Sequence, residues 1–384
     1  MPFKYILYLL IVIVQQAVAQ NVGIDEKYQI YKHRFETEFL TSTENPHKTG
    51  AFLPVEYINS KGEKFTGDEV WYLGLYLAVL STEYHLNTKN NRLKEAEQNL
   101  NQIRNILITL DRLDTAAERY FGKKAKLNGF FVRNDSQPNS GFNSQDQIWN
   151  TFYGFKMLKK FVGDTAIIAH MQAISIRFLN SMYSVVEEKN GKQVRKWRIL
   201  DPNGKVLQKP EEMLVSKYAF CKIASDLADS NLFLPGSDNM FSRFMSSSAR
   251  MGMYHRTTLR KHSHVYNTYG IAILTMMAFP EKGYKFSAKI ERIAMKHFPK
   301  GTFSHISLSS CILYNHKPLQ NKEFYTGILE NAPVSGPAYG LKNEWNSLNL
   351  LACPWQDSWK GRYNGLDFML LHNLVKIVFG EQKK

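Results

Sequence analysis

The pattern of apolar and polar residues alternates between two kinds of helix along most of the chain. Residues 70–80 are apolar nearly all round, which is typical of a helix that is buried on every side. Residues 92–121 are rich in Glu, Gln and Arg, and their apolar residues keep to one stripe, as in an amphipathic helix. We therefore expect these segments to form an antiparallel hairpin of one buried and one amphipathic helix.

The same alternation continues towards the C-terminus. Residues 146–162 predict a second buried helix, and residues 165–186 predict a longer amphipathic helix after it. Asn190-Gly191 and Asn203-Gly204 are typical hairpin turns, and the residues between them alternate like a strand. We therefore predict an all-α body with a small β insertion near residues 189–209. Further helices are expected at 28–40, 214–228, 237–253, 263–277, 287–297 and 365–379, whereas 303–314 is ambiguous between helix and strand.

Several buried helices begin with polar and aromatic residues that are soon followed by a glycine. This arrangement occurs before Gly74, Gly154 and Gly270, and more loosely around Gly365. Because glycine has no side chain, it allows a neighbouring helix to approach closely. We expect close helix contacts at these positions, although aromatic residues and glycines are also common in ordinary helical cores.

The first residues have the features of a secretory signal peptide. Lys4 gives a positive start, residues 5–14 form a short apolar run, and Ala17-Val18-Ala19 is a small-x-small cleavage site. An uncleaved anchor is the alternative. We expect a mature protein that begins at Gln20, is periplasmic or secreted and has no stable membrane span. Its predicted parts are the signal peptide at 1–19, an N-terminal extension at 20–65 and one helical domain at 66–384.

The chain is strongly basic, with 49 Lys and Arg residues, 34 Asp and Glu residues and a formal net charge of +15. A basic exported protein can meet an acidic polysaccharide, an anionic lipid or a nucleic acid, although a solvated Lys-rich surface is simpler. Export argues against nucleic acid as a partner. Cysteines occur only at Cys221, Cys311 and Cys353, so a disulfide scaffold is not expected. Three buried free thiols are the simpler expectation; if one bridge forms, Cys311 and Cys353 are the preferred pair.

Two segments resemble parts of exported α/α proteins. One is Asn128-Gly129-Phe130-Phe131-Val132-Arg133-Asn134-Asp135 followed by Ser144-Gln145-Asp146-Gln147, and the other covers residues 361–373. With the helix alternation over most of residues 66–380, they resemble the six-hairpin α/α toroids of secreted carbohydrate-active proteins. The resemblance implies an inner ring of apolar helices, an outer ring of amphipathic helices and a glycan ligand. It supplies no catalytic residues, because no signature of one glycosidase or lyase family matches.

In such a toroid the ends of the inner helices line one cleft, where glycoside hydrolysis requires two carboxyl groups. Asp146 is the first candidate because it lies in the first turn of a buried helix, although such a carboxylate often caps a helix. Asp68 is similar, with Thr66 as the rival cap. Asp367 lies in an apolar run and needs a partner, for which Arg362 or His372 is suitable. Other acidic residues at such positions are Glu69, Asp135, Glu344 and Asp357.

A basic cluster at residues 255–267 favours a different reaction. A polysaccharide lyase neutralises the carboxylate of a uronate and uses a His or Tyr to remove a proton from the sugar. His264 and Tyr266 are suitable for the proton, and Asn267 for the carboxylate. A solvated basic loop is the simpler explanation.

Sugar sites combine aromatic platforms with a few hydrogen-bonding side chains. Neither a metal nor a cofactor is predicted, since no P-loop, HExxH, EF-hand or dinucleotide motif is present. The sequence favours an exported glycoside hydrolase, with a lyase for acidic glycans or a non-catalytic glycan-binding or envelope scaffold protein as alternatives. The residues expected to bind substrate are Arg133, Asp135, Trp149, Tyr153, Asn267, Trp355, Trp359 and Tyr363, of which each aromatic residue alone is more typical of a core.

Overall fold

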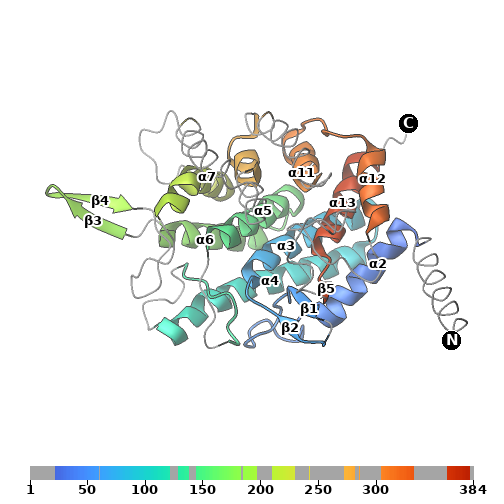
Figure 1. Ribbon diagram of the computed structural model, residues 1–384, viewed down its shortest axis with the longest axis horizontal. Coiled ribbons are helices and arrows are strands. Elements are labelled where there is room, and N and C mark those ends of the chain that lie inside the picture. The colour runs from blue at the N-terminus through green and yellow to red at the C-terminus, as the bar shows by residue number, and fades with distance from the viewer. Residues whose placement is uncertain are drawn as a thin grey trace, which may run out of the picture.

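The computed structural model is mostly helical, and its described residues contain two small sheets (Figure 1). The predicted all-α class is therefore confirmed. The signal peptide, the helix expected at 287–297, all of the helix expected at 237–253 except residue 242, and the second half of the β insertion lie outside the described part of the chain. The structure describes residues 22–59, 61–121, 129–137, 144–182, 185–196, 210–229, 242, 272–281, 285, 304–332 and 361–380.

The first predicted pair of helices is present. Helix α3 (Glu69–Lys89) is buried at every residue from Glu69 to Glu83, as its continuous apolar pattern predicts. Helix α4 (Leu93–Phe121) follows after a short turn and packs against α3. Most of its apolar stripe is buried, and Ile103 and Leu110 are fully buried. Burial of this stripe stabilises the hairpin, because each large apolar side chain removed from water contributes about 1.5–3 kcal/mol.

The second pair and the β insertion follow in the order expected. Helix α5 (Gln145–Phe161) is followed by α6 (Thr165–Met182), which ends earlier than predicted because the chain then turns into a strand. Strands β3 (Val185–Lys189) and β4 (Lys192–Lys196) pair around Asn190 and Gly191. Both turn residues have positive φ, 53° and 71°, as a two-residue hairpin turn of this kind requires. Helix α7 (Pro210–Ala228) then returns to the helical body.

The C-terminal part of the described chain is also helical. The ambiguous segment forms α11 (Ser304–Tyr314), and residues 272–278 confirm the end of another expected helix. The last helix, α13 (Leu366–Phe379), is buried at every residue from Leu366 to Val375. Helix α12 (Lys322–Asn331) was not expected from the sequence; its N-cap Asn321 accepts a hydrogen bond from the Phe324 amide at 3.1 Å.

The N-terminal extension packs into the same core as the helical body. Helix α2 (Ile24–Arg34) continues into a π-helical turn, η1 (Phe35–Phe39). Tyr31 stacks on Phe368 of α13 with ring centroids 4.3 Å apart. Strand β1 (Tyr57–Asn59) pairs with β2 (Lys64–Phe65) and with β5 (Gly361–Tyr363), so the two ends of the described chain share one antiparallel sheet.

The structure also bears on the cysteines and on membrane association. Cys221 and Cys311 are both free thiols, as the interpretation without a disulfide expects, and Cys353 lies outside the described residues. The partly buried Cys311 thiol donates to the Ser307 carbonyl one helical turn earlier at 3.2 Å. Among the described residues, every helix is too short or too polar to cross a bilayer.

Candidate functional site

Helices α3 and α5 touch through two glycines. A Cβ at Gly74 would lie 2.5 Å from the carbonyl oxygen of Asn150, and a Cβ at Gly154 would lie 2.2 Å from the carbonyl oxygen of Gly74. These distances are too short for any side chain, which confirms the close contact predicted at these positions. Near the helix starts, Gln147 of α5 accepts a hydrogen bond from the Trp71 amide of α3 at 3.0 Å. The N-terminal ends of the two helices therefore lie side by side.

Asp68 occupies the N-cap position of α3 but makes no capping hydrogen bond. Its Oδ1 instead accepts from Gln147 Nε2 at 2.8 Å and from Arg133 Nη1 at 3.2 Å. The side chain keeps 18% of its surface exposed. The capping role that an Asp at this position usually has is therefore replaced by contacts with a neighbouring helix and a loop.

Arg133 connects the starts of both helices. Its guanidinium donates to the Gly67 carbonyl at 3.0 Å, to Asp68 and to Ser144 Oγ at 3.1 Å. Ser144 is the N-cap residue of α5, and it too makes no capping hydrogen bond. The side chains at both N-cap positions thus bind Arg133 rather than the first amides of their helices. We call the group formed by Asp68, Glu69, Arg133, Ser144 and Gln147 the α3–α5 mouth.

Glu69 lies beside Asp68 and is buried, with 1% of its surface exposed. Its carboxyl group accepts from Asn134 Nδ2 at 2.7 Å and from the Gly67 amide at 2.8 Å. Burial raises the pKa of Glu69 to about 7, and the charge of Asp68 adds to the rise, although the hydrogen bonds oppose it. Glu69 can therefore hold or release a proton near neutral pH, next to a carboxylate that is paired with a guanidinium.

The sequence predicts Asp68 and Asp146 as catalytic residues and Arg133 as a substrate-binding residue, and it names Glu69 only among further acidic candidates. The structure brings Asp68 and Arg133 into contact. Asp146 lies in the first turn of α5, directly before Gln147. The available signal for Glu69 was its position in the first turn of a helix that is apolar nearly all round, because a carboxyl group there is shielded from water.

Asp135 has a structural role in this fold. Its side chain is fully buried and pairs with Arg112, whose Nε lies 2.7 Å from Oδ2. It also accepts from the Gly50 amide at 3.0 Å, which fastens the loop before β1. Its carboxylate is thus enclosed by protein donors, and its role in substrate binding stays a prediction.

Two of the predicted aromatic platforms lie in the core. Trp149 is 3% exposed, and Tyr153 is fully buried with its hydroxyl 2.6 Å from Ser309 Oγ. An aromatic platform needs an open ring face on which a sugar can stack, and neither residue has one here. Both residues therefore lie in the core of the helical body, and their role in substrate binding stays a prediction.

Asp367 is buried in the first turn of α13. Its predicted partner His372 instead places Nε2 2.8 Å from Asp25 Oδ1. The backbone carbonyl of Asp367 accepts from His305 Nε2 at 2.8 Å, and burial lowers the pKa of His305 to about 4. His305 is therefore neutral at physiological pH and serves as a donor that ties α11 to α13.

The remaining predicted residues are not placed by the structure. His264, Tyr266, Asn267, Trp355 and Trp359 lie outside the described residues, as do Glu344 and Asp357. Tyr363 is described through its backbone, which pairs with Tyr57 in the sheet. The lyase cluster therefore stays a prediction.

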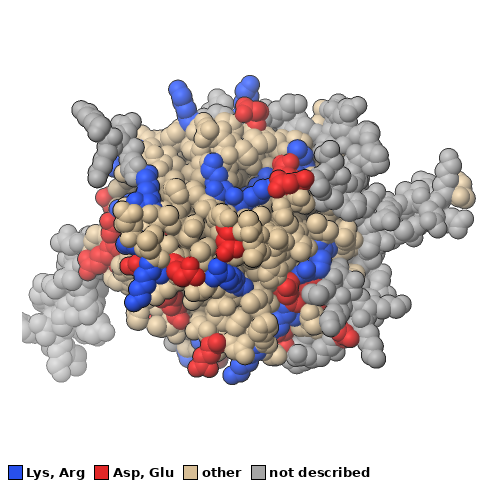
Figure 2. Space-filling view, turned by 180° about the vertical axis from the view of Figure 1, so that it is seen from behind, with Lys and Arg blue, Asp and Glu red and all other residues tan. Residues whose placement is uncertain are grey.

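The surface in Figure 2 shows no large area of one charge over its described part, since Lys and Arg side chains are interspersed with Asp and Glu. That arrangement does not single out an acidic ligand for this face. The described residues contain no group of three or more His, Cys, Asp or Glu that could hold a metal ion. At the α3–α5 mouth the available chemistry is therefore that of carboxyl groups, a guanidinium and amides.

The fold and mouth define a mostly helical protein with a cluster of carboxyl groups at two adjoining helix starts. No family model, no curated protein and no solved structure matches the chain. The function is therefore argued from the site itself.

Proposed function

We propose that the protein is an exported glycoside hydrolase built on an α/α toroid, with its catalytic site at the α3–α5 mouth. The observation that carries the proposal is the placement of Asp68. Its carboxylate is held by Arg133 and Gln147 instead of capping α3, beside the first turn that contains Asp146. Export follows from the signal-peptide pattern at residues 1–19.

Helix packing supports the toroid. The buried helices α11, α13, α3 and α5 each contact the next, and α11 also contacts α5. The bond between Tyr153 and Ser309 joins α5 to α11. Helices α4, α6 and α12 each contact the buried helix that is next to them in the sequence, which is α3, α5 and α13, respectively. In the proposed ring, the outer helices have this position. Inner helix starts would then meet at one face, where a substrate could lie across them.

The proposed chemistry uses two carboxyl groups with different tasks. Asp146 donates a proton to the glycosidic oxygen as the bond between that oxygen and the anomeric carbon breaks. Asp68 remains ionised beside Arg133 and either attacks the anomeric carbon itself or activates a water molecule that attacks it. The spacing of the two carboxyl groups decides between retention and inversion of configuration. Glu69 is a positioning residue: it binds the Gly67 amide and Asn134, and its own ionisation changes the charge next to Asp68.

The proposal is tested on the products. Mature protein from Gln20 onward is incubated with neutral and uronate-containing glycans, and new reducing ends are recorded together with the ultraviolet absorbance of unsaturated uronate. Hydrolysis gives reducing ends without absorbance. Both signals together would replace this proposal with a lyase that uses His264, Tyr266 and Asn267. Neither signal, with glycan binding retained, would assign the protein to the non-catalytic glycan-binding class.

The lyase is the second candidate because of the net charge of +15. A basic protein binds an acidic polymer through many charge pairs, and salt screens them. Binding of polygalacturonate that weakens steeply with added sodium chloride would favour this candidate. Binding of a neutral glycan that is unchanged by salt would favour the hydrolase.

A further inference from the structure

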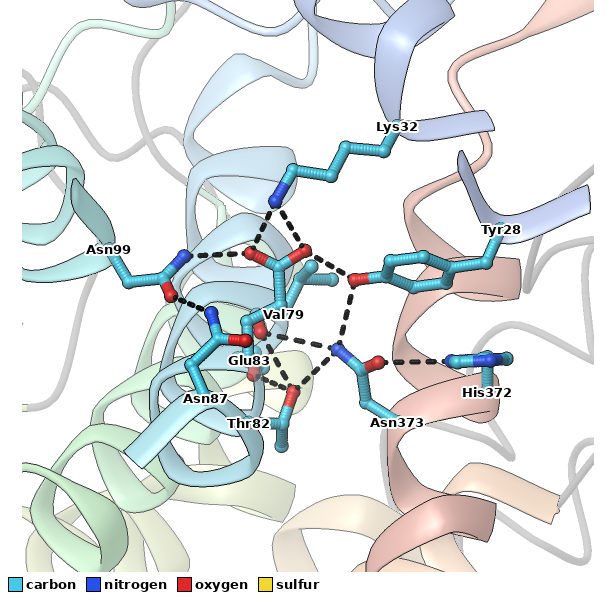
Figure 3. Close-up of polar contacts among 10 residues, drawn as sticks. Tyr28, Lys32, Val79, Thr82, Glu83, Asn87, Asn99, His372 and Asn373 are labelled. Atoms are coloured by element: carbon cyan, nitrogen blue, oxygen red, sulfur yellow. Dashed lines mark hydrogen bonds and ion pairs between the residues drawn. The ribbon is translucent and has the colours of Figure 1, made fainter. Parts of the chain in front are cut away.

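A groove of about 820 Å³ lies at the other end of α3, between that helix and α2, α4 and α13. Figure 3 shows the polar side chains that form its floor. Glu83, which lines the groove, comes 15 residues after Asp68, so the groove lies roughly 22 Å along α3 from Asp68 at 1.5 Å per residue. It is therefore separate from the α3–α5 mouth. Its volume lies within the range of small-ligand sites, roughly 300–1,000 Å³.

The floor of the groove is built around the carboxylate of Glu83. Lys32 Nζ lies 3.0 Å and 2.9 Å from its two oxygens, Asn99 Nδ2 donates at 2.7 Å, and the Tyr28 hydroxyl also donates to it. Figure 3 shows these groups converging from α2 and α4 on a residue of α3. Only 7% of the Glu83 side chain is exposed. A buried carboxylate with this many donors is held firmly in one place.

Amides extend this floor to both sides. Asn87 Nδ2 donates to Asn99 Oδ1 at 2.8 Å. On the other side, Asn373 of α13 donates to Thr82 Oγ1 at 3.1 Å and to the Tyr28 hydroxyl at 3.3 Å (Figure 3). Four helices thus contribute to one connected network, which fixes the shape of the floor before any ligand arrives.

The walls carry amides whose hydrogen-bonding capacity is unused. Gln102 Oε1 is shielded from solvent and has no donor within the described residues. Asn90 and Gln98 also line the groove and are exposed, and neither side chain has a hydrogen bond in the described part of the chain. An amide offers both donors and an acceptor, which matches a hydroxyl group that donates and accepts at once.

The charges that line the groove nearly cancel. Four carboxylates face three Lys or Arg side chains, so the lining does not select strongly for an anion or a cation. The lining also contains amides from α2, α3, α4 and α13. We propose that this groove is a second, non-catalytic binding site for a neutral oligosaccharide. It would hold a glycan chain on the far side of α3 from the mouth, and it does not depend on the proposed hydrolysis.

The test uses cellohexaose, xylohexaose, maltohexaose and N-acetylchitohexaose, titrated by calorimetry into the full mature chain. The double variant Asn90→Ala/Gln98→Ala should weaken binding of the recognised hexaose at least tenfold. Gln102→Leu, which keeps the volume of the side chain, should act in the same direction. The matched control is Asn101→Ala/Asn105→Ala on α4, outside the groove, which should bind within twofold of the wild type.

Hydrogen exchange locates the bound sugar. Protection of amides in residues 83–102 on adding the hexaose is the expected result. Failure of all four hexaoses to bind, or binding that survives the groove variants, would overturn the proposal. Protection confined to residues 66–71 and 144–151 would also overturn it, while leaving the catalytic proposal for the mouth intact.

Discussion

Gly154 of α5 rests on the backbone of Gly74 of α3, so closely that a Cβ on Gly154 would lie 2.2 Å from the Gly74 carbonyl oxygen. This contact lets two helices approach along their length and aligns their starts, where Asp68 meets Gln147 at 2.8 Å. The geometry of the mouth thus depends on two residues that have no side chains. Neither could be replaced without moving a helix.

Gly154→Ala should therefore destabilise the protein by about 3 kcal/mol, the upper part of the usual range for overpacking in a core. The measurement is the free energy of unfolding in urea. The matched control is Gly327→Ala in α12, where a Cβ meets nothing within 4 Å. There the free energy of unfolding should rise by about 1 kcal/mol, because alanine favours a helix more than glycine does. Equal effects at both positions would show that the helix contact is not tight.

A pH dependence of stability follows from Glu69. Its folded-state pKa is raised to about 7, so the folded state binds a proton that the unfolded state has already released. The contribution of Glu69 to the free energy of unfolding is therefore fully present below about pH 4.5 and is lost as the pH rises through about 7. The loss should reach roughly 3 kcal/mol.

The variant Glu69→Gln does not titrate and should lack this loss. Its free energy of unfolding, relative to that of the wild type, should rise between about pH 4.5 and pH 7. Glu95→Gln serves as the control, since Glu95 also lies in a first turn, that of α4, but is exposed. A difference between wild type and Glu69→Gln that stays constant with pH would contradict the assignment of a raised pKa.

Asp135 and Asp68 each pair with an arginine, but the two pairs should respond differently to mutation. The Asp135–Arg112 pair has side-chain exposures of 0% and 10%, whereas Asp68 and Arg133 are 18% and 27% exposed. Asp135→Ala leaves a buried guanidinium without its carboxylate and should cost about 3–5 kcal/mol. Asp68→Asn should cost less than about 1 kcal/mol. Thermal unfolding measures both losses of stability. A larger loss for Asp68→Asn than for Asp135→Ala would contradict the structural role assigned to the Asp135–Arg112 pair.

Local patterns predicted most of the helices. The apolar runs of α3 and α13 and the stripe of α4 specify their burial directly, and Asn190-Gly191 specifies the β3–β4 turn. The pairing of β1 with β5 was not predictable in this way. It joins residues about 300 positions apart, and neither short strand has a local signal for its partner.

The candidate site was predictable by region rather than by residue. Asp68 stands out because its residue type suits a polar helix start, and Arg133 because it lies in the polar segment 128–135 that precedes the next buried helix. Whether a side chain at such a position is open or enclosed depends on the surrounding helices. Trp149 and Tyr153 have the composition of a sugar platform, but packing encloses them, and Glu69 acquires its raised pKa only through burial.

The central claim is that the α3–α5 mouth performs hydrolysis, and the turnover of Asp146→Asn tests it most directly. The wild type and this variant are compared on the glycan that the wild type cleaves, by release of reducing ends, with thermal unfolding measured in parallel. The predicted result is loss of turnover by at least about a hundredfold with stability nearly unchanged, because one proton-transferring group is removed. Asp68→Asn should give the same loss. Retained turnover with a large loss of stability would assign Asp146 to helix capping and Asp68 to a structural pair with Arg133, and would contradict the claim.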